Sequence, residues 1–161
     1  MKSFFQFSLF VFCTFCIASC CKEESDLIGQ NDFLIFGHFY GECAGEGCIE
    51  TFKLEENRLL EATVDQYAPD GYYNFDAFEV LSHQKFEAVR DLIDYFPDEL
   101  IEDERTVIGQ PDAADWGGIF VELKSGDLHR YWRLDNMEDN MPQVYNDFVD
   151  RIHERIAIIN E

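Results

Sequence analysis

The sequence predicts an α+β fold, in which an antiparallel sheet of two hairpins and about five strands is covered by two amphipathic helices. Two segments with short, mostly apolar strand patterns, residues 33–64 and 119–134, carry the strands. Each is followed by a segment whose apolar residues recur at helical spacing, residues 82–96 and 140–159. Strands and helices in this order can bury the apolar side of each helix against the sheet.

The chain begins with a predicted lipoprotein signal peptide, residues 1–19. Lys2 gives a positive start, and the apolar run up to Ile17 is shorter than the about 20 residues that a membrane-spanning helix requires. The run ends in "IASC", which resembles a bacterial lipobox, and the resemblance implies that Cys20 receives the lipid. Cys20 fits this motif better than Cys21, because an aliphatic and two small residues precede it. An ordinary signal peptide with a chance cysteine is the alternative.

Acylation of Cys20 would anchor the mature chain to a membrane, because each buried CH₂ contributes about 0.8 kcal/mol. The following residues, "KEE", resemble a signal for the outer face of the outer membrane. We therefore expect an outer-membrane lipoprotein, with the cell surface favoured over the periplasmic face. Residues 20–31 would form an acidic tether, and residues 32–161 a single α+β domain.

The first hairpin carries a predicted disulfide between Cys43 and Cys48. Residues 33–40, "FLIFGHFY", are apolar on both sides and predict a strand in the middle of a sheet, covered on each face. "IETFKL" follows the cysteines as its partner, and residues 59–64 form a third strand. An exported chain meets an oxidising compartment, where so short a disulfide loop contributes about 2 kcal/mol. The alternative is a zinc site with His38, which would need reduced thiols and a fourth ligand.

Two helices and a second hairpin complete the predicted domain. Residues 65–77 form a loop with four aromatic residues, and a helix runs from its N-cap Ser82 to Pro97. The second hairpin turns at Ser125-Gly126-Asp127. The last helix starts near Asn140, with Pro142 in its first turn. The predicted buried sides of the helices are Phe86, Val89, Ile93 and Phe96 in the first, and Tyr145, Phe148, Ile152, Ile156 and Ile159 in the second.

The charge of the chain limits its partners. With 12 basic and 33 acidic residues, the formal net charge is −21. This field repels phosphate backbones and attracts divalent cations, so nucleic acid is not an expected partner. The alternative interpretation is that the acidic residues only keep an envelope protein soluble.

Two acidic loops are candidates for a calcium site. "PDAAD" places Asp112 and Asp115 in one turn, and "DNMEDN", residues 135–140, supplies further oxygen ligands. Oxygen ligands on loops are typical of calcium sites. The spacing does not match an EF-hand, and turns and caps require the same residue types. No other cofactor is expected.

The strand "HRYWRL" is the candidate ligand-binding element. His129, Tyr131 and Arg133 share one predicted side, and Trp132 lies on the other with Arg130. Aromatic and cationic side chains on an exposed strand bind sugars or carboxylates, so an envelope protein or a glycan is the expected partner. The alternative is a structural role, in which Arg130 or Arg133 pairs with Glu122 across the hairpin.

Catalysis is the second functional hypothesis. A hydrolase would place its site in the loops at residues 108–118 and 129–140, with Asp112, Asp115 and His129. No GxSxG, HExxH or phosphate-binding motif occurs in the sequence. We therefore expect a non-catalytic binding or structural module, and assign no catalytic residue.

Three stretches, "FGHFYGECAGEGCIETFKL", "IGQPDAADWGG" and "RYWRLD", resemble a group of uncharacterised Gram-negative lipoproteins. The similarity covers most of residues 33–159. In that group two cysteines often flank the Pro-Asp turn, where this chain has Gln110 and Ala113. The resemblance therefore implies a shared fold and no second disulfide here, and it implies no known activity.

Overall fold

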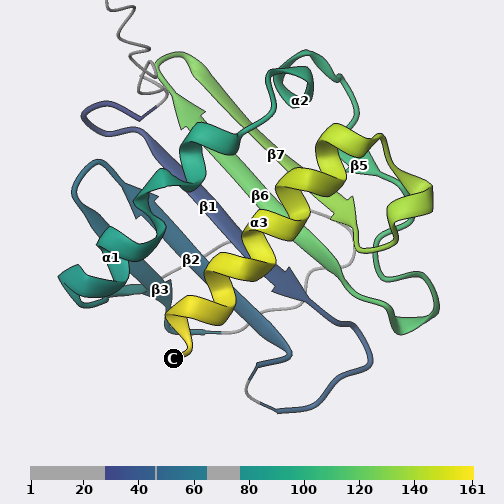
Figure 1. Ribbon diagram of the computed structural model, residues 1–161, viewed down its shortest axis with the longest axis horizontal. Helices are drawn as coiled ribbons and strands as arrows, with labels where there is room; N and C mark the ends of the chain where they lie inside the picture. Colours follow the sequence, from purple (N-terminus) through teal and green to yellow (C-terminus); the bar gives the residue numbers. More distant parts are fainter. Residues whose placement is uncertain (1–27, 46, 65–76) are drawn as a thin grey trace, which may run out of the picture.

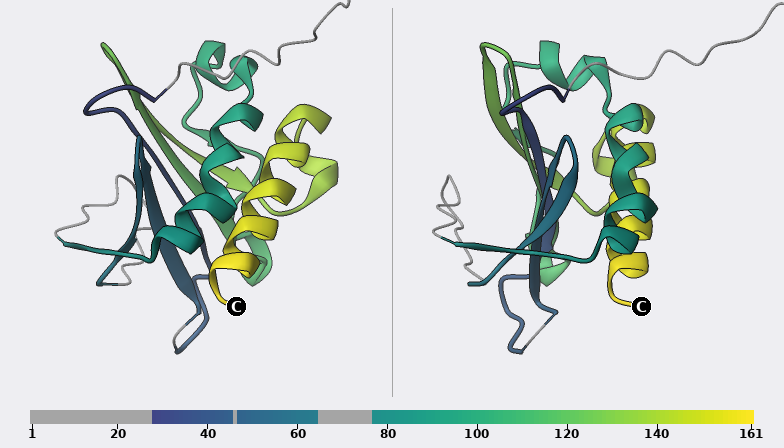
Figure 2. Two further views of the ribbon diagram at one scale, coloured as in Figure 1. Left: turned by 60° about the vertical axis from the view of Figure 1, so that its left-hand side comes forward. Right: turned by 90° about the vertical axis from the view of Figure 1, so that its left-hand side faces the viewer.

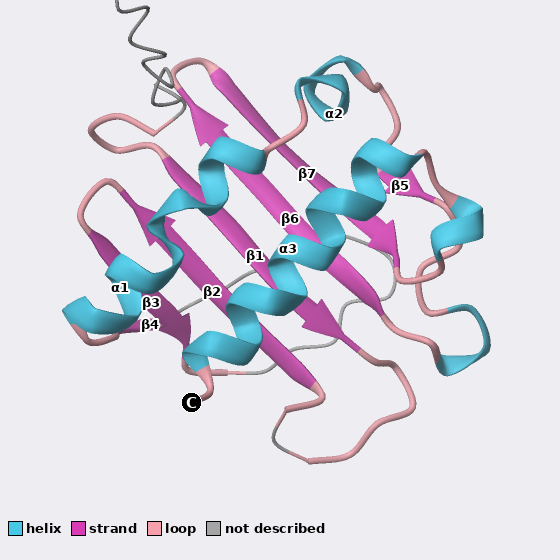
Figure 3. Ribbon diagram, viewed as in Figure 1, coloured by secondary structure: helices cyan, strands magenta, loops and turns pink. Residues whose placement is uncertain are grey.

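The structure, a computed structural model, describes residues 28–45, 47–64 and 77–161. The signal peptide, Cys20, Cys21 and most of the predicted loop at 65–77 lie outside these residues. Within the described part the fold is α+β, as the sequence predicts. A seven-stranded sheet with the order β4-β3-β2-β1-β6-β7-β5 forms one layer, and helices form the other (Figures 1 and 3).

The described part of the chain forms seven strands, three α-helices and three short 3₁₀ segments. The strands are β1 (Phe33–Phe39), β2 (Ile49–Glu55), β3 (Arg58–Ala62), β4 (Phe78–Val80), β5 (Val107–Ile108), β6 (Gly118–Ser125) and β7 (Leu128–Asp135). The α-helices are α1 (His83–Val89), α2 (Asp98–Glu102) and α3 (Gln143–Ile159). Short 3₁₀ segments are η1 (Arg90–Tyr95), η2 (Ala113–Asp115) and η3 (Glu138–Asn140).

The prediction of about five strands is wrong, because the sheet has two further strands at its edges. β4 has three residues and pairs antiparallel with β3, and β5 has two residues and pairs parallel with β7. The sheet is therefore mixed, although mostly antiparallel. Strands this short have no measurable alternation, so no sequence pattern could indicate them. Short edges also leave few unpaired backbone groups for aggregation.

The first predicted helix is divided into two pieces, and a further short helix lies beyond its predicted end. α1 begins after the N-cap Ser82, whose hydroxyl accepts a hydrogen bond from the backbone N–H of Lys85. After Val89 the chain continues as η1, and α2 follows Pro97. The side chains predicted to be buried are nevertheless in the core: Phe86, Val89, Ile93 and Phe96 are at most 8 % exposed.

α3 begins at Gln143, after Pro142, and so starts slightly later than predicted. Its predicted apolar stripe is confirmed as buried: Tyr145, Phe148, Ile152, Ile156 and Ile159. α1, η1 and α3 lie on the same face of the sheet (Figure 2). On the second face of the sheet, Ile35, Phe39 and Phe120 form a smaller buried cluster. The predicted cover of β1 on this face stays a prediction. Because none of the described helices lies on this second face, we call it the helix-free face.

One end of the sheet has the entering chain and a tight turn, and the other end has the longer loops. In antiparallel register Phe33 lies opposite Lys124, and Phe39 lies opposite Gly118. We call the end with Asp32 and the β6–β7 turn the tether end, because the chain enters the domain there. The opposite end, with the loops at 40–48, 109–117 and 136–142, is called the loop end.

Candidate functional site

Strand β7 separates the four candidate ligand-binding residues into two groups. His129, Tyr131 and Arg133 lie on the helix-free face, as the alternation predicts. Trp132 points to the helices, is completely buried, and packs edge-to-face on Phe96 with ring centroids 5.7 Å apart. On the helix-free face His129 is exposed and Tyr131 is partly buried, whereas Arg133 is buried. Trp132 serves the core.

The three residues on the helix-free face are ordered by contacts with neighbouring strands. Tyr131 stacks on Phe120 at 6.2 Å between ring centroids, and the guanidinium of Arg133 lies 4.9 Å from the ring centroid of Phe39. The ring of His129 meets the ring of Phe33 edge-on at 5.8 Å. Each side chain is thereby held in one orientation, as a binding surface or a packed sheet face would require.

Glu122 has a cross-strand contact that the sequence did not predict. Nε2 of His129 lies 2.7 Å from Oε1 of Glu122, whose side chain is 1 % exposed. The register places Glu122 opposite Tyr131, so His129 reaches it diagonally along the same face. Arg130, one predicted partner, lies on the other face of the strand.

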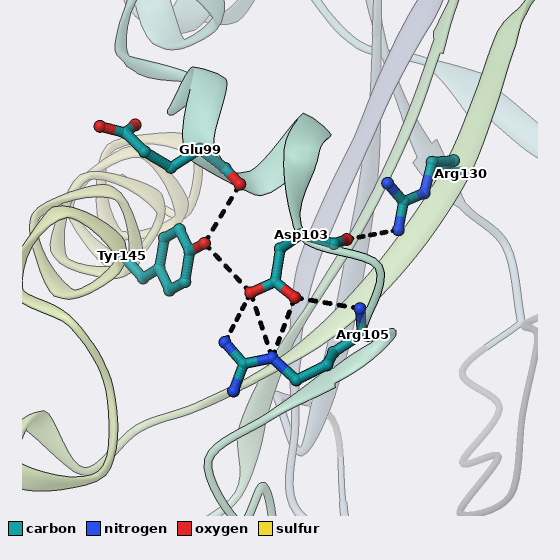
Figure 4. Close-up of polar contacts among 5 residues, drawn as sticks. All are labelled: Glu99, Asp103, Arg105, Arg130 and Tyr145. Carbon is teal, nitrogen blue, oxygen red and sulfur yellow. Dashed lines mark hydrogen bonds and ion pairs between the residues drawn. The ribbon is translucent and has the colours of Figure 1, made fainter.

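Arg130 belongs to a polar cluster that the sequence analysis did not identify (Figure 4). Its Nη1 and Nη2 donate hydrogen bonds of 2.7 and 2.5 Å to the carbonyl oxygens of Ile101 and Asp103. These carbonyls are at the end of α2, where backbone acceptors lack partners within the helix. The arginine therefore fastens α2 to the sheet.

The side chain of Asp103 completes this cluster. Its carboxylate accepts hydrogen bonds from Arg105, with Nη2 to Oδ2 at 2.6 Å, and lies 3.2 Å from the hydroxyl of Tyr145 (Figure 4). The Arg105 hydrogen bonds hold the pKa of Asp103 well below its usual range, while burial and the Asp103 charge raise the pKa of Tyr145. The hydrogen bonds of Arg130 and of the Tyr145 hydroxyl link α2 to β7 and to α3.

The Pro-Asp turn uses a predicted calcium ligand to bind the backbone. Oδ1 of Asp112 accepts a hydrogen bond of 3.0 Å from the backbone N–H of Gly41. Three residues of the turn that are not glycine have positive φ: Asp112 at 64°, Ala114 at 55° and Asp115 at 64°. Such conformations cost on the order of 1 kcal/mol each, so the surrounding contacts must hold the turn in place. The side chain of Asp115 is exposed.

Asp135 provides the main contact that holds this turn. Its carboxylate accepts hydrogen bonds from the backbone N–H groups of Gln110 at 2.6 Å and Met137 at 3.0 Å, and from Nδ2 of Asn140 at 2.7 Å. The residue is 1 % exposed. Gly109 lies so close that a Cβ there would be 2.5 Å from the Asp135 Cβ. The loop at 109–117 is thus adjacent to residues 136–140, but the rest of the second predicted loop belongs to β7, and His129 lies opposite Lys124 near the other end of the sheet. Asp112 and His129 of the hydrolase hypothesis are therefore not brought together, and backbone amides bind the carboxylates of Asp112 and Asp135.

The predicted disulfide is confirmed and lies in the β1–β2 loop, with the Cα atoms of Cys43 and Cys48 5.6 Å apart. Both thiols are therefore engaged, which makes the zinc alternative wrong. The imidazole of His38 contacts the same loop, with Nε2 2.9 Å from the carbonyl oxygen of Gly47.

His38 also meets a second histidine, which the scattered sequence positions did not indicate. The rings of His38 and His153 stack with centroids 6.5 Å apart, and Nε2 of His153 lies 3.1 Å from Oδ1 of Asn136. Burial, followed by the influence of His38, lowers the pKa of His153. Nδ2 of Asn136 donates in turn to the carbonyl oxygen of Trp116 at 2.9 Å. This chain of contacts joins the disulfide loop, α3 and the Pro-Asp turn.

Across residues 28–45, 47–64 and 77–161, no group of three His, Cys, Asp or Glu side chains is placed to hold a metal ion. In the same part of the chain no helix has the length and apolar character that crossing a bilayer requires. The calcium prediction at Asp112 and Asp115 is not tested by this finding and remains a prediction. The predicted lipid anchor at Cys20 lies outside the described residues and also remains a prediction.

Comparison with known proteins found neither a matching family model nor a similar curated protein. The resemblance to Gram-negative lipoproteins therefore also remains a prediction, and the function has to be argued from the chain itself.

Proposed function

We propose that this chain is an outer-membrane lipoprotein, anchored through Cys20, whose folded domain binds another component of the cell envelope without catalysing a reaction. The signal peptide and the "IASC" motif support the anchor. The engagement of Asp112 and Asp135 with backbone amides supports a non-catalytic role, because an acid or base must be available to a substrate. The "KEE" sequence supports exposure at the cell surface.

The observation that carries the proposal is the place where the chain enters the sheet, at Asp32, relative to the loop end. Oδ1 of Asp32 accepts a hydrogen bond of 3.0 Å from the backbone N–H of Gly126 and lies 3.7 Å from Nζ of Lys124. These contacts fix the entering chain to the β6–β7 turn. The eight residues of β7 separate this turn from the loop end by about 24 Å, at about 3.4 Å per residue. An anchor at Cys20 therefore leaves the loop end available to a partner.

The loop end presents an aromatic residue suited to binding. The side chain of Trp116 is 62 % exposed, and Met137 on the adjacent loop is 40 % exposed. Gly117 has φ of 71° and lies directly against Tyr40, and Asn136 binds the Trp116 carbonyl. A large aromatic side chain on a fixed backbone is a typical anchor of protein and glycan interfaces. We infer that Trp116 forms the centre of the contact.

The anchor is tested by intact-mass measurement of protein extracted from membranes. The wild type should begin at Cys20 and carry acyl mass. Cys20→Ser should abolish both features, whereas Cys21→Ser, the matched control, should retain them. Equal acylation of the Cys20→Ser protein would contradict the assignment.

The loop-end contact is tested by photo-crosslinking in intact cells. p-Benzoylphenylalanine in place of Trp116 should give a defined crosslinked product. The same substitution for Asp127, in the exposed β6–β7 turn at the tether end, serves as the control and should give little. Equal yields from the two positions would remove the loop end as the contact surface.

A further inference from the structure

A groove of about 440 Å³ lies between α3 and the junction of η1 with α2, away from the loop end and the helix-free face. Its floor contains two buried apolar residues, Pro97 and Phe148, and Val144 lines it as well. Phe148 is fixed by edge-to-face packing on Phe96, with ring centroids 5.3 Å apart. The volume falls in the range of small-ligand sites, about 300–1,000 Å³. We call it the α3 groove.

The rim of the α3 groove is acidic. Asp147, Asp150 and Glu154 all line it, and all three are exposed. Arg151 is the one basic residue among the described residues that line it. The rim therefore has two more negative than positive charges, which disfavours anionic lipid headgroups, phosphates and a second copy of this acidic chain.

The side chain of Arg151, which lines the groove, contacts an aromatic ring and a carboxylate. The guanidinium of Arg151 lies 4.7 Å from the ring centroid of Tyr95, and its Nη1 is 2.7 Å from Oε2 of Glu154. An aromatic face and a carboxylate together are favourable for a guanidinium or an ammonium group. The contacts of Arg151 thus indicate that this surface favours a guanidinium group.

We propose that the α3 groove binds a basic segment of another protein, with an aliphatic side chain on Pro97 and Phe148 and a neighbouring arginine or lysine at Asp147 and Asp150. The apolar floor supplies burial, and the carboxylates select the cation. This site is separate from the Trp116 surface and does not depend on the lipid anchor. Arg151 competes with the incoming cation for Tyr95 and Glu154, so it limits the affinity.

The test uses the full chain in nonionic detergent and the peptide acetyl-Arg-Leu-Arg-amide, with binding followed by NMR titration. Shifts should be concentrated at residues 95–97 and 144–154. The triple variant Asp147→Asn, Asp150→Asn, Glu154→Gln should bind about tenfold more weakly, since each exposed pair contributes only modestly. The matched control is Glu42→Gln, Glu56→Gln, Asp127→Asn, which changes the net charge equally at exposed positions elsewhere and should change the affinity less than about twofold.

A second comparison tests the resident cation. Arg151→Ala should tighten peptide binding several-fold, whereas Arg58→Ala, which removes an exposed arginine from the β2–β3 turn, should leave it nearly unchanged. Equal losses in the two triple variants would mean attraction by net charge alone and would overturn the proposal. It would also be overturned by the absence of peptide binding, by equal binding of acetyl-Glu-Leu-Glu-amide, or by identical effects of the two arginine substitutions. Circular dichroism and thermal melting confirm that each variant is folded.

Discussion

Replacing Asp135 by asparagine tests whether this buried carboxylate holds the loop end together. Oδ2 accepts two hydrogen bonds, from Gln110 and Asn140, and Oδ1 accepts one, from Met137. Asparagine has nearly the same shape but retains only one acceptor oxygen. With its amino group at the Oδ1 position, the N–H of Met137 loses its partner, and in the other orientation two donors do.

A buried donor without a partner costs about 1–3 kcal/mol, so Asp135→Asn should lower the free energy of unfolding by about 2 kcal/mol. Asp135→Ala leaves three donors unpaired and should cost about 4 kcal/mol. For a domain of this size the asparagine variant should melt roughly 6–8 °C lower. Urea denaturation at pH 7 measures the free energy, and Asp139→Asn, an exposed change in the same loop, should stay within about 0.5 kcal/mol of wild type.

Unfolding of Asp135→Asn at the same urea concentration as the Asp139→Asn control would refute this role of the carboxylate. In that case water or a rearranged backbone would satisfy the three donors, and the Pro-Asp turn would keep its conformation without the carboxylate. A loss confined to the asparagine and alanine variants would instead show that this one side chain stabilises the contact between the two loops.

Three further predictions concern the fold. The lowered pKa of Asp103 contributes folding stability that is fully present above the unfolded pKa of 3.8 and is lost as the pH falls further. Urea denaturation at pH 5 and at pH 2 should therefore show a smaller loss of unfolding free energy for Asp103→Asn than for wild type. Gly37→Ala would place a Cβ against the backbone oxygen of Glu50, and should lower the unfolding free energy by at least about 2 kcal/mol in the same assay. The double change Cys43→Ser, Cys48→Ser should cost about 2 kcal/mol in thermal or urea unfolding, and an equal stability of the two forms would contradict a structural disulfide.

The sequence predicted the elements that are long enough to show a period. The β6–β7 hairpin and the buried stripe of α3 follow directly from alternation over eight residues and helical spacing over 17 residues. β4 and β5 were missed because their position is set by partners, such as Val80 opposite Leu60. Their existence depends on strand pairing across the sheet, which a local pattern does not contain.

The candidate site was only partly predictable for the same reason. Alternation placed Tyr131 and Trp132 on opposite faces, but the pairing of Glu122 with His129 depends on the register that the two-residue turn sets. The contacts of Asp103 with Tyr145 and of His38 with His153 join residues far apart in the chain. A local sequence pattern cannot indicate a contact between two single residues that are separated by many positions in the chain.

Salt dependence distinguishes the two proposed binding surfaces, because they rely on different interactions. At physiological ionic strength charges are screened over about 8 Å, so the net charge of −21 acts weakly on a bound segment, and the nearest carboxylates dominate. Binding in the α3 groove depends on Asp147, Asp150 and Glu154 and should weaken strongly as salt is added. Binding at Trp116 depends on apolar burial and should change little. A partner that loses affinity in salt yet is unaffected by the groove variants would show that charge outside the groove governs binding.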